Sequence, residues 1–155
     1  MTLMVGRRYK FSLPELLNEL VEEVINFNSQ RDDFSGNTSF RCVSLAFNGT
    51  KLLSVGYNKP KTHPFTKKYH DLHKMSIHAE ADMIMDLLKR NKISKITDIV
   101  VIRGSTTPLS SKPCEICRGL IAMYLPKVRV WWFDDATNEW NVEFAERIGR
   151  LKYDF

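Results

Sequence analysis

The chain has 155 residues, of which 43% are hydrophobic and 26% are charged. This composition is typical of a globular protein that buries a core without disulfides. No apolar run approaches the ~20 residues that span a bilayer, and the N-terminus lacks the basic-then-apolar order of a secretion signal. We expect one domain over residues 1–155 and no membrane segment. The net charge of +5 is compatible with an anionic ligand but identifies none.

The three cysteines do not support a disulfide framework. Cys114 and Cys117 form a tight Cys-x-x-Cys pair, which is more typical of metal binding than of a disulfide scaffold. Cys42 is left over in an apolar run and is most simply a small buried hydrophobe. We therefore expect a protein of the reducing cytosol.

The first predicted element is an amphipathic helix over residues 14–28. Ser12 stands before it as a possible cap, and Pro14 falls in its first turn, where proline is tolerated. Its apolar residues recur at helical spacing: Leu16, Leu17, Leu20, Val21, Val24 and Ile25.

Two strands follow, over residues 40–47 and 51–57. They flank Asn48-Gly49, the strongest short-range signal for a β-hairpin. A long loop is expected over residues 58–77.

The second half of the chain alternates helices and strands. We predict a helix over residues 78–91, a buried strand over 96–103, a helix over 114–125 that Pro126 ends, and a strand over 127–133. This order predicts a three-layer α/β/α sandwich, with a parallel crossover in its second half.

A last strand is predicted where Trp140, Val142 and Phe144 alternate with polar residues. Only about six turn-rich residues separate it from the preceding strand, too few for a crossover helix. We therefore expect a mixed five-stranded sheet whose last strand is antiparallel. The alternative is a helix over residues 139–151, capped by Asn138.

Two short motifs carry metal chemistry. His78-Ala79-Glu80 and Pro113-Cys114-Glu115-Ile116-Cys117 both fall at predicted helix starts. Structural zinc sites close all four positions with protein ligands, whereas catalytic sites leave one open for water. His78, Cys114 and Cys117 supply three ligands, which favours a catalytic site. A structural site would need a fourth ligand, and the available ones are His63, His70, His73 and Cys42.

A His-x-Glu followed by Pro-Cys-x-x-Cys resembles the zinc-dependent cytidine/deoxycytidylate deaminase superfamily over about residues 37–145. The resemblance implies a cytidine-deaminase-like fold in which two helix N-termini converge on Zn²⁺. It implies that His78, Cys114 and Cys117 hold the metal, which activates water for attack on the ring. Glu80 then moves the proton to the ring nitrogen and helps ammonia to leave.

A second resemblance concerns Val55-Gly56-Tyr57-Asn58, because deoxycytidylate deaminases carry Gly-Tyr-Asn-Gly at the end of the second strand. It implies that Asn58 contacts the sugar of the substrate. Lys59 stands where that family has glycine, and Asn58 alternatively just starts a turn. The candidates for substrate contact are Asn58, Lys59, Ala79 and Pro113.

The leading hypothesis is a hydrolytic deaminase of a small cytosine substrate, converting dCMP to dUMP or acting on the free nucleoside. Residues 59–74 hold five lysines and one acid, and this loop can bind a 5′-phosphate or a nucleic-acid backbone. One alternative is therefore an RNA- or single-stranded-DNA-editing deaminase. Another is a non-catalytic binding protein stabilised by zinc. The resemblance also implies a homo-oligomer, and a compact enzyme of this kind would suit a bacteriophage acting in its host's cytoplasm.

Overall fold

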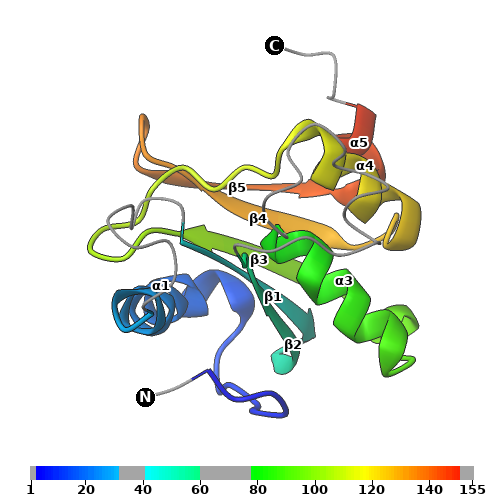
Figure 1. The fold of residues 1–155 in the computed structure, drawn as a ribbon, viewed down its shortest axis with the longest axis horizontal. Coiled ribbons are helices and arrows are strands. Elements are labelled where there is room, and N and C mark those ends of the chain that lie inside the picture. The colour runs from blue at the N-terminus through cyan, green and yellow to red at the C-terminus, as the bar shows by residue number, and fades with distance from the viewer. Residues whose placement is uncertain (1–2, 32–40, 60–77, 151–155) are drawn as a thin grey trace.

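The computed structural model describes residues 3–31, 41–59 and 78–150, without the side chains of residues 149 and 150 (Figure 1). Every helix and strand predicted in these ranges is present, with boundaries shifted by one or two residues. The elements are α1 (Leu13–Ser29), β1 (Cys42–Asn48), β2 (Lys51–Tyr57), α3 (Ala79–Lys89), the short 3₁₀ helix η2 (Ile93–Lys95), β3 (Asp98–Arg103), α4 (Glu115–Tyr124), β4 (Arg129–Asp134), β5 (Glu139–Phe144) and α5 (Ala145–Arg150).

The five strands form one mixed sheet in the order β2-β1-β3-β4-β5. β1 pairs antiparallel with both β2 and β3, whereas β3 and β4 are parallel and α4 provides the crossover between them. In the β1–β2 hairpin the positive φ of 61° falls on Gly49, and Asn48 ends the strand. Glycine adopts this conformation without steric penalty, which explains why the turn forms here.

The C-terminal hairpin is confirmed, because β5 pairs antiparallel with β4 from Asp134↔Glu139 to Arg129↔Phe144. Asn138 lies in the connecting turn with a φ of 58° and does not cap a helix. The alternative of a helix from residue 139 is wrong, since the helix α5 begins only at Ala145. The four residues between Asp134 and Glu139 cannot carry a parallel crossover, so the length of the connection decided the direction of the strand.

Helices cover both faces of the sheet (Figure 1). Side chains of a strand alternate between faces, so neighbouring residues of β3 enter different cores. Val100 and Ile102 pack with α1, whereas Ile99 and Val101 pack with α3, α4 and α5. The predicted three-layer α/β/α sandwich is thus confirmed. Among the described residues, none of the helices has both the length and the apolarity needed to cross a membrane.

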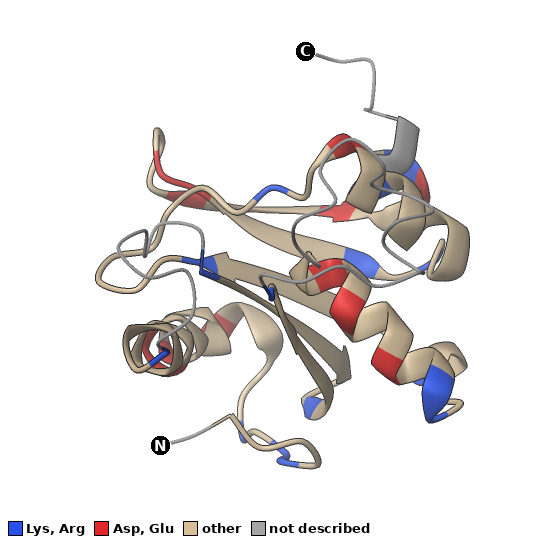
Figure 2. Ribbon diagram, viewed as in Figure 1, with Lys and Arg blue, Asp and Glu red and all other residues tan. Residues whose placement is uncertain are grey.

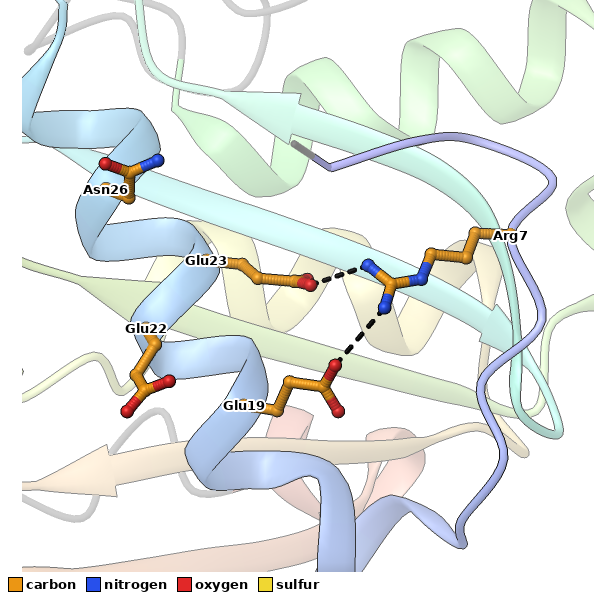
Figure 3. Close-up of a pocket in the computed structure, with 5 residues that line it drawn as sticks. All are labelled: Arg7, Glu19, Glu22, Glu23 and Asn26. Carbon is orange, nitrogen blue, oxygen red and sulfur yellow. Dashed lines mark hydrogen bonds and ion pairs between the residues drawn. The ribbon is translucent and has the colours of Figure 1, made fainter. Parts of the chain in front are cut away.

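The segment before α1 is joined to the helix by a polar network around the buried carboxylate of Glu23 (Figure 3). Arg7 Nη1 donates to Glu23 Oε1 at 2.6 Å, and the hydroxyl of Tyr9 donates to Glu23 Oε2 at 2.7 Å. Arg7 also reaches Glu19 at 3.2 Å and lies over the ring of Tyr9 at 4.2 Å. Glu23 is only 6% exposed, so Arg7 compensates a carboxylate that has lost most of its water.

Replacing Arg7 with Met is therefore expected to lower the free energy of unfolding by about 2–4 kcal/mol, because Glu23 would remain buried without its cation. Urea denaturation measures this value. The matched control is Glu19→Gln, which removes the more exposed carboxylate of the same arginine and should change stability by under about 1 kcal/mol. Equal effects of the two substitutions would show that burial of Glu23 is unimportant.

Candidate metal centre and active site

The first ligand candidate stands at the start of α3. His78 is the N-cap residue, with an extended backbone (φ −75°, ψ 151°), and the helix begins at Ala79. Glu80 and Asp82 in the first turn and Lys89 in the last complement the helix dipole, as the acidic and basic ends of α3 in Figure 2 show. The N-cap position leaves the imidazole of His78 outside the body of the helix.

The other two candidates stand at the start of α4. Cys114 is the N-cap residue, also extended (φ −65°, ψ 166°), and its Sγ accepts a hydrogen bond from the backbone N–H of Cys117 at 3.4 Å. A helix N-terminus presents unpaired N–H groups and partial positive charge, both of which favour a thiolate. Cys117 follows one turn later and is buried.

The fold brings these three side chains together from positions 36 and 39 residues apart. His78 Nδ1 lies 3.6 Å from Cys114 Sγ and 3.5 Å from Cys117 Sγ. Tetrahedral zinc with Zn–S near 2.3 Å and Zn–N near 2.0–2.1 Å requires nitrogen–sulfur separations of about 3.5–3.6 Å. The donor set and its spacing therefore fit such an ion.

A fourth protein ligand is not found among the described residues. The group of possible ligand atoms within 4.8 Å of one another contains His78, Cys114 and Cys117, and Cys42 is outside it. The other candidates for a structural site, His63, His70 and His73, lie outside the described residues. Within the described ranges, the candidate ligands are therefore three.

Glu80 lies next to this cluster but does not belong to it. The side chain is 5% exposed, and burial, followed by the charge of Cys114, raises the pKa of its carboxyl to about 7. A group that titrates near neutrality can both accept and give a proton. Its position in the first turn of α3 keeps it within the electrostatic reach of His78 and Cys114.

The backbone of β2 touches α3 directly at Gly56. A Cβ atom added to Gly56 would overlap the carbonyl oxygen of Ala79 and lie 2.5 Å from the backbone nitrogen of Met83. Only glycine allows this approach, which sets the distance between the sheet and the helix that carries His78 and Glu80. In the sequence, Gly56 is part of the Gly-Tyr-Asn motif that resembles deoxycytidylate deaminases. No sequence pattern predicted that Gly56 contacts α3.

The four candidates for substrate contact lie at two places in the fold, one between the end of β2 and the start of α3 and the other just before α4. Asn58 follows β2, and its Oδ1 accepts from the backbone N–H of Cys42 at 2.9 Å. Lys59 Nζ forms an ion pair with Asp82 Oδ1 at 2.9 Å. This carboxylate offsets the positive charge of Lys59, which we expect to bind a phosphate. Ala79 is buried against Gly56, and Pro113 is buried directly before the N-cap of α4. Their roles toward a substrate stay predictions, and the lysine-rich loop beyond Lys59 lies outside the described residues.

The second motif is supported by Ser111, whose contacts the sequence did not predict. Ser111 is buried, donates to the carbonyl of Val101 at 2.6 Å, and accepts from the N–H of Phe133 at 2.9 Å. It thereby ties the loop before Cys114 to both parallel strands. Arg118 is also buried, and its Nε has no hydrogen-bond partner within the described part of the chain. A serine two residues before a proline is too common to predict these contacts of Ser111.

A pocket of about 370 Å³ lies beside the same loop. Lys112, two residues before Cys114, holds its ammonium 5.8 Å from the ring centroid of Trp132. The residues around the pocket are Ser110, Lys112, Trp132, Phe133, Asp134 and Asn141. A cation, an aromatic face and an amide are groups that bind nucleotides.

Comparison with known proteins finds a distant likeness among solved structures. No protein-family model matches the chain, and no curated protein matches it. Among solved structures, it is similar to the dCMP deaminase from the cyanophage S-TIM5, determined in complex with dCMP and dUMP. The two are 16% identical, and the match covers 76% of this chain and 79% of the other, with a TM-score of 0.47.

Proposed function

We propose that the protein is a zinc-dependent hydrolytic deaminase of the cytidine/deoxycytidylate deaminase superfamily, and that it converts dCMP to dUMP with release of ammonia. The observation that carries this proposal is the meeting of His78, Cys114 and Cys117 at nitrogen–sulfur distances of 3.5–3.6 Å. The chemistry of these donors and their number support zinc with an open position.

We infer the roles of the residues from this arrangement together with the resemblance of the two motifs. Zinc, when bound, lowers the pKa of water toward neutrality and so supplies a nucleophile. Glu80 accepts a proton on a carboxylate oxygen, delivers it to the ring nitrogen next to the carbon under attack, and assists protonation of the leaving amine. The N-termini of α3 and α4 stabilise the negative charge of the two sulfurs.

The burial of Glu80 argues against a non-catalytic zinc protein. A carboxylate that is 5% exposed and lies near a thiolate loses stability relative to a solvated one. A site that only held the fold together would gain nothing from this unfavourable placement, whereas a pKa raised toward neutrality favours proton transfer.

A substrate panel tests the proposed function. Zinc-loaded protein is incubated with cytidine, deoxycytidine, CMP, dCMP and a cytosine-containing oligonucleotide, while ammonia and uracil products are measured. We expect dCMP to give the highest kcat/KM. One zinc per chain with no turnover of any cytosine substrate would refute the proposal, and preference for deoxycytidine would move the assignment to the free nucleoside.

The pocket beside Lys112 and Trp132 favours one second candidate, a deaminase of single-stranded nucleic acid. Its cation and aromatic ring lie beside the loop that leads to Cys114, where a flanking nucleotide of a polymer would need them.

This candidate predicts that Lys112→Ala weakens turnover of the oligonucleotide and flattens its salt dependence by about 0.7 in log–log slope, the effect of one lost phosphate contact. Turnover of dCMP should not change. Lys127→Ala, at the opposite end of β4, is the control, and kcat/KM at several salt concentrations is the measurement. An identical response of the two variants would exclude the pocket from nucleic-acid binding.

A further inference from the structure

Positively charged side chains gather at the end of the sheet where β3 begins. Asn48, the last residue of β1, pairs there with Lys51, the first residue of β2, and Asp98 starts β3 beside them. The candidate metal centre lies at the other end, where Gly56 near the end of β2 touches the start of α3. Strands of six or seven residues separate the two ends by about 20 Å.

Two of these cations lie directly opposite each other. Arg8 and Lys51 form an isolated antiparallel bridge, so their side chains leave the same face of the sheet. Their chain neighbours Tyr9 and Leu52 both enter the core beneath α1, which directs Arg8 and Lys51 to the face that α3 covers. Directly opposed like charges destabilise a sheet. A bound anion would offset this repulsion.

Two lysines reach the same end of the sheet from α3. Lys92 precedes the 3₁₀ helix η2, and Lys95 ends it. Thr97 then fastens this segment to the β1–β2 turn, because its N–H donates to the carbonyl of Phe47 at 2.8 Å and its Oγ1 accepts from the N–H of Gly49 at 2.8 Å. Lys92 and Lys95 are thereby held close to the turn that Lys51 follows.

The charge of this surface is not neutralised within the described part of the chain. There, no ion pair involves the side chains of the surface that we call the basic end: Arg8, Lys10, Lys51, Lys92 and Lys95. The neighbouring acids have cations of their own: Glu19 pairs with Arg7, Asp86 with Arg90, and Asp98 with Arg129. Figure 2 shows blue segments in the N-terminal segment, at the start of β2 and at the end of α3.

The basic end stops before Lys127. A groove of about 180 Å³ lies between η2 and the connection that carries Lys127. The backbone N–H of Glu146 donates to the carbonyl of Pro126 at 3.0 Å, which places a carboxylate beside this lysine. Lys127 therefore adds little to the net positive charge of the surface.

The residue types of the basic end favour one kind of anionic partner. Lysine is depleted in the cores of protein–protein interfaces, whereas lysine and arginine supply most contacts to nucleic-acid phosphates. Proteins that bind single strands add aromatic rings on which bases stack. Among the described residues, the exposed aromatic side chain at this surface is Phe11, at its margin beside Lys10. Cations without a row of rings fit the phosphates of a duplex, which carries one charge per about 1.7 Å of its axis.

We propose that the basic end binds the phosphate backbone of double-stranded DNA without reading its sequence. The duplex is a partner of this surface and not a substrate, because the candidate metal centre lies at the other end of the sheet. The inference therefore does not rest on the proposed function.

The test measures binding of the zinc-loaded protein to a short labelled duplex, by fluorescence anisotropy at several salt concentrations. The wild type should bind with a Kd on the order of 10⁻⁴–10⁻⁶ M near physiological salt. The double variant Lys51→Gln/Lys95→Gln should bind more weakly. Its log–log salt slope should be smaller by about 1.8, which corresponds to two lost phosphate contacts at ~0.9 each.

A matched control removes the same net charge elsewhere. Gln30→Glu/Asn138→Asp also lowers the net charge by two, but Gln30 follows the end of α1 and Asn138 lies in the turn after β4. Both positions are at the other end of the sheet, since Asn28 at the end of α1 donates to the carbonyl of Gly104 after β3. This variant should keep the wild-type slope.

Thermal unfolding separates binding from folding. Lys51→Gln relieves the repulsion with Arg8, so the melting temperature should not fall while DNA binding weakens. Equal weakening by the double variant and the control would show that net charge alone attracts DNA, and would overturn the proposal. An unchanged slope in Lys51→Gln/Lys95→Gln would place DNA binding elsewhere in the chain. Binding of anionic lipid vesicles without binding of the duplex would assign the surface to a membrane instead.

A last measurement distinguishes this inference from the proposed function. Saturating duplex should leave kcat/KM for dCMP unchanged, because the two surfaces lie at opposite ends of the sheet. Competitive inhibition by the duplex would show that it occupies the candidate active site, and would overturn the proposal. Binding at the basic end in a protein that deaminates no cytosine substrate would refute the proposed function and leave this inference intact.

Discussion

Glu80→Gln is expected to reduce kcat by roughly 10²–10⁴-fold, the usual contribution of a positioned acid–base group, while one zinc remains bound per chain. Glutamine preserves the shape of the side chain but cannot carry a proton between water and the ring. Ammonia release measures kcat, and a chelator-based assay measures the metal. Glu80 is outside the ligand cluster, so its substitution should leave the cluster intact.

Glu115→Gln is the matched control, because this exposed carboxylate occupies the first turn of α4 beside Cys114. It should retain wild-type activity. Full activity of Glu80→Gln would refute proton transfer by Glu80. Loss of zinc from that variant would show that Glu80 supports the ligands instead.

Gly56→Ala is expected to lower zinc affinity, stability and turnover, although Gly56 is not itself a candidate ligand. The new methyl group would overlap the carbonyl oxygen of Ala79 and approach the backbone nitrogen of Met83 to 2.5 Å. Since both neighbours are backbone atoms, no rotamer change relieves the clash and α3 must move. Overpacking of this kind costs about 1–3 kcal/mol of stability. A shift of the helix by about 1 Å can lower turnover roughly 10²-fold, because His78 and Glu80 move with it.

The measurements are zinc affinity, urea denaturation and kcat/KM. Gly119→Ala in α4 is the matched control, because an added Cβ there meets nothing within 4 Å. It should stabilise the helix by about 0.5–1 kcal/mol and preserve zinc binding. Wild-type zinc affinity in Gly56→Ala would show that the contact between β2 and α3 does not position the ligand.

The elements of the fold were predictable because each has a local cause. The apolar spacing of residues 14–28 predicts the helix α1, and Asn48-Gly49 predicts the hairpin of β1 and β2. The short connection before Trp140 predicts an antiparallel last strand, which the pairing of β4 with β5 confirms. The periodicity did not locate the start of α5, since Phe144 fits a strand and a helix equally well.

The residues that can bind a metal were predictable from the two motifs, because only certain side chains ligate zinc and both motifs stand at helix starts. Packing between separate elements brings His78 to both cysteines, Gly56 against α3, and Arg31 to Asn58, 27 residues away. Such contacts depend on how separate elements pack, and no period or local propensity along the chain encodes them.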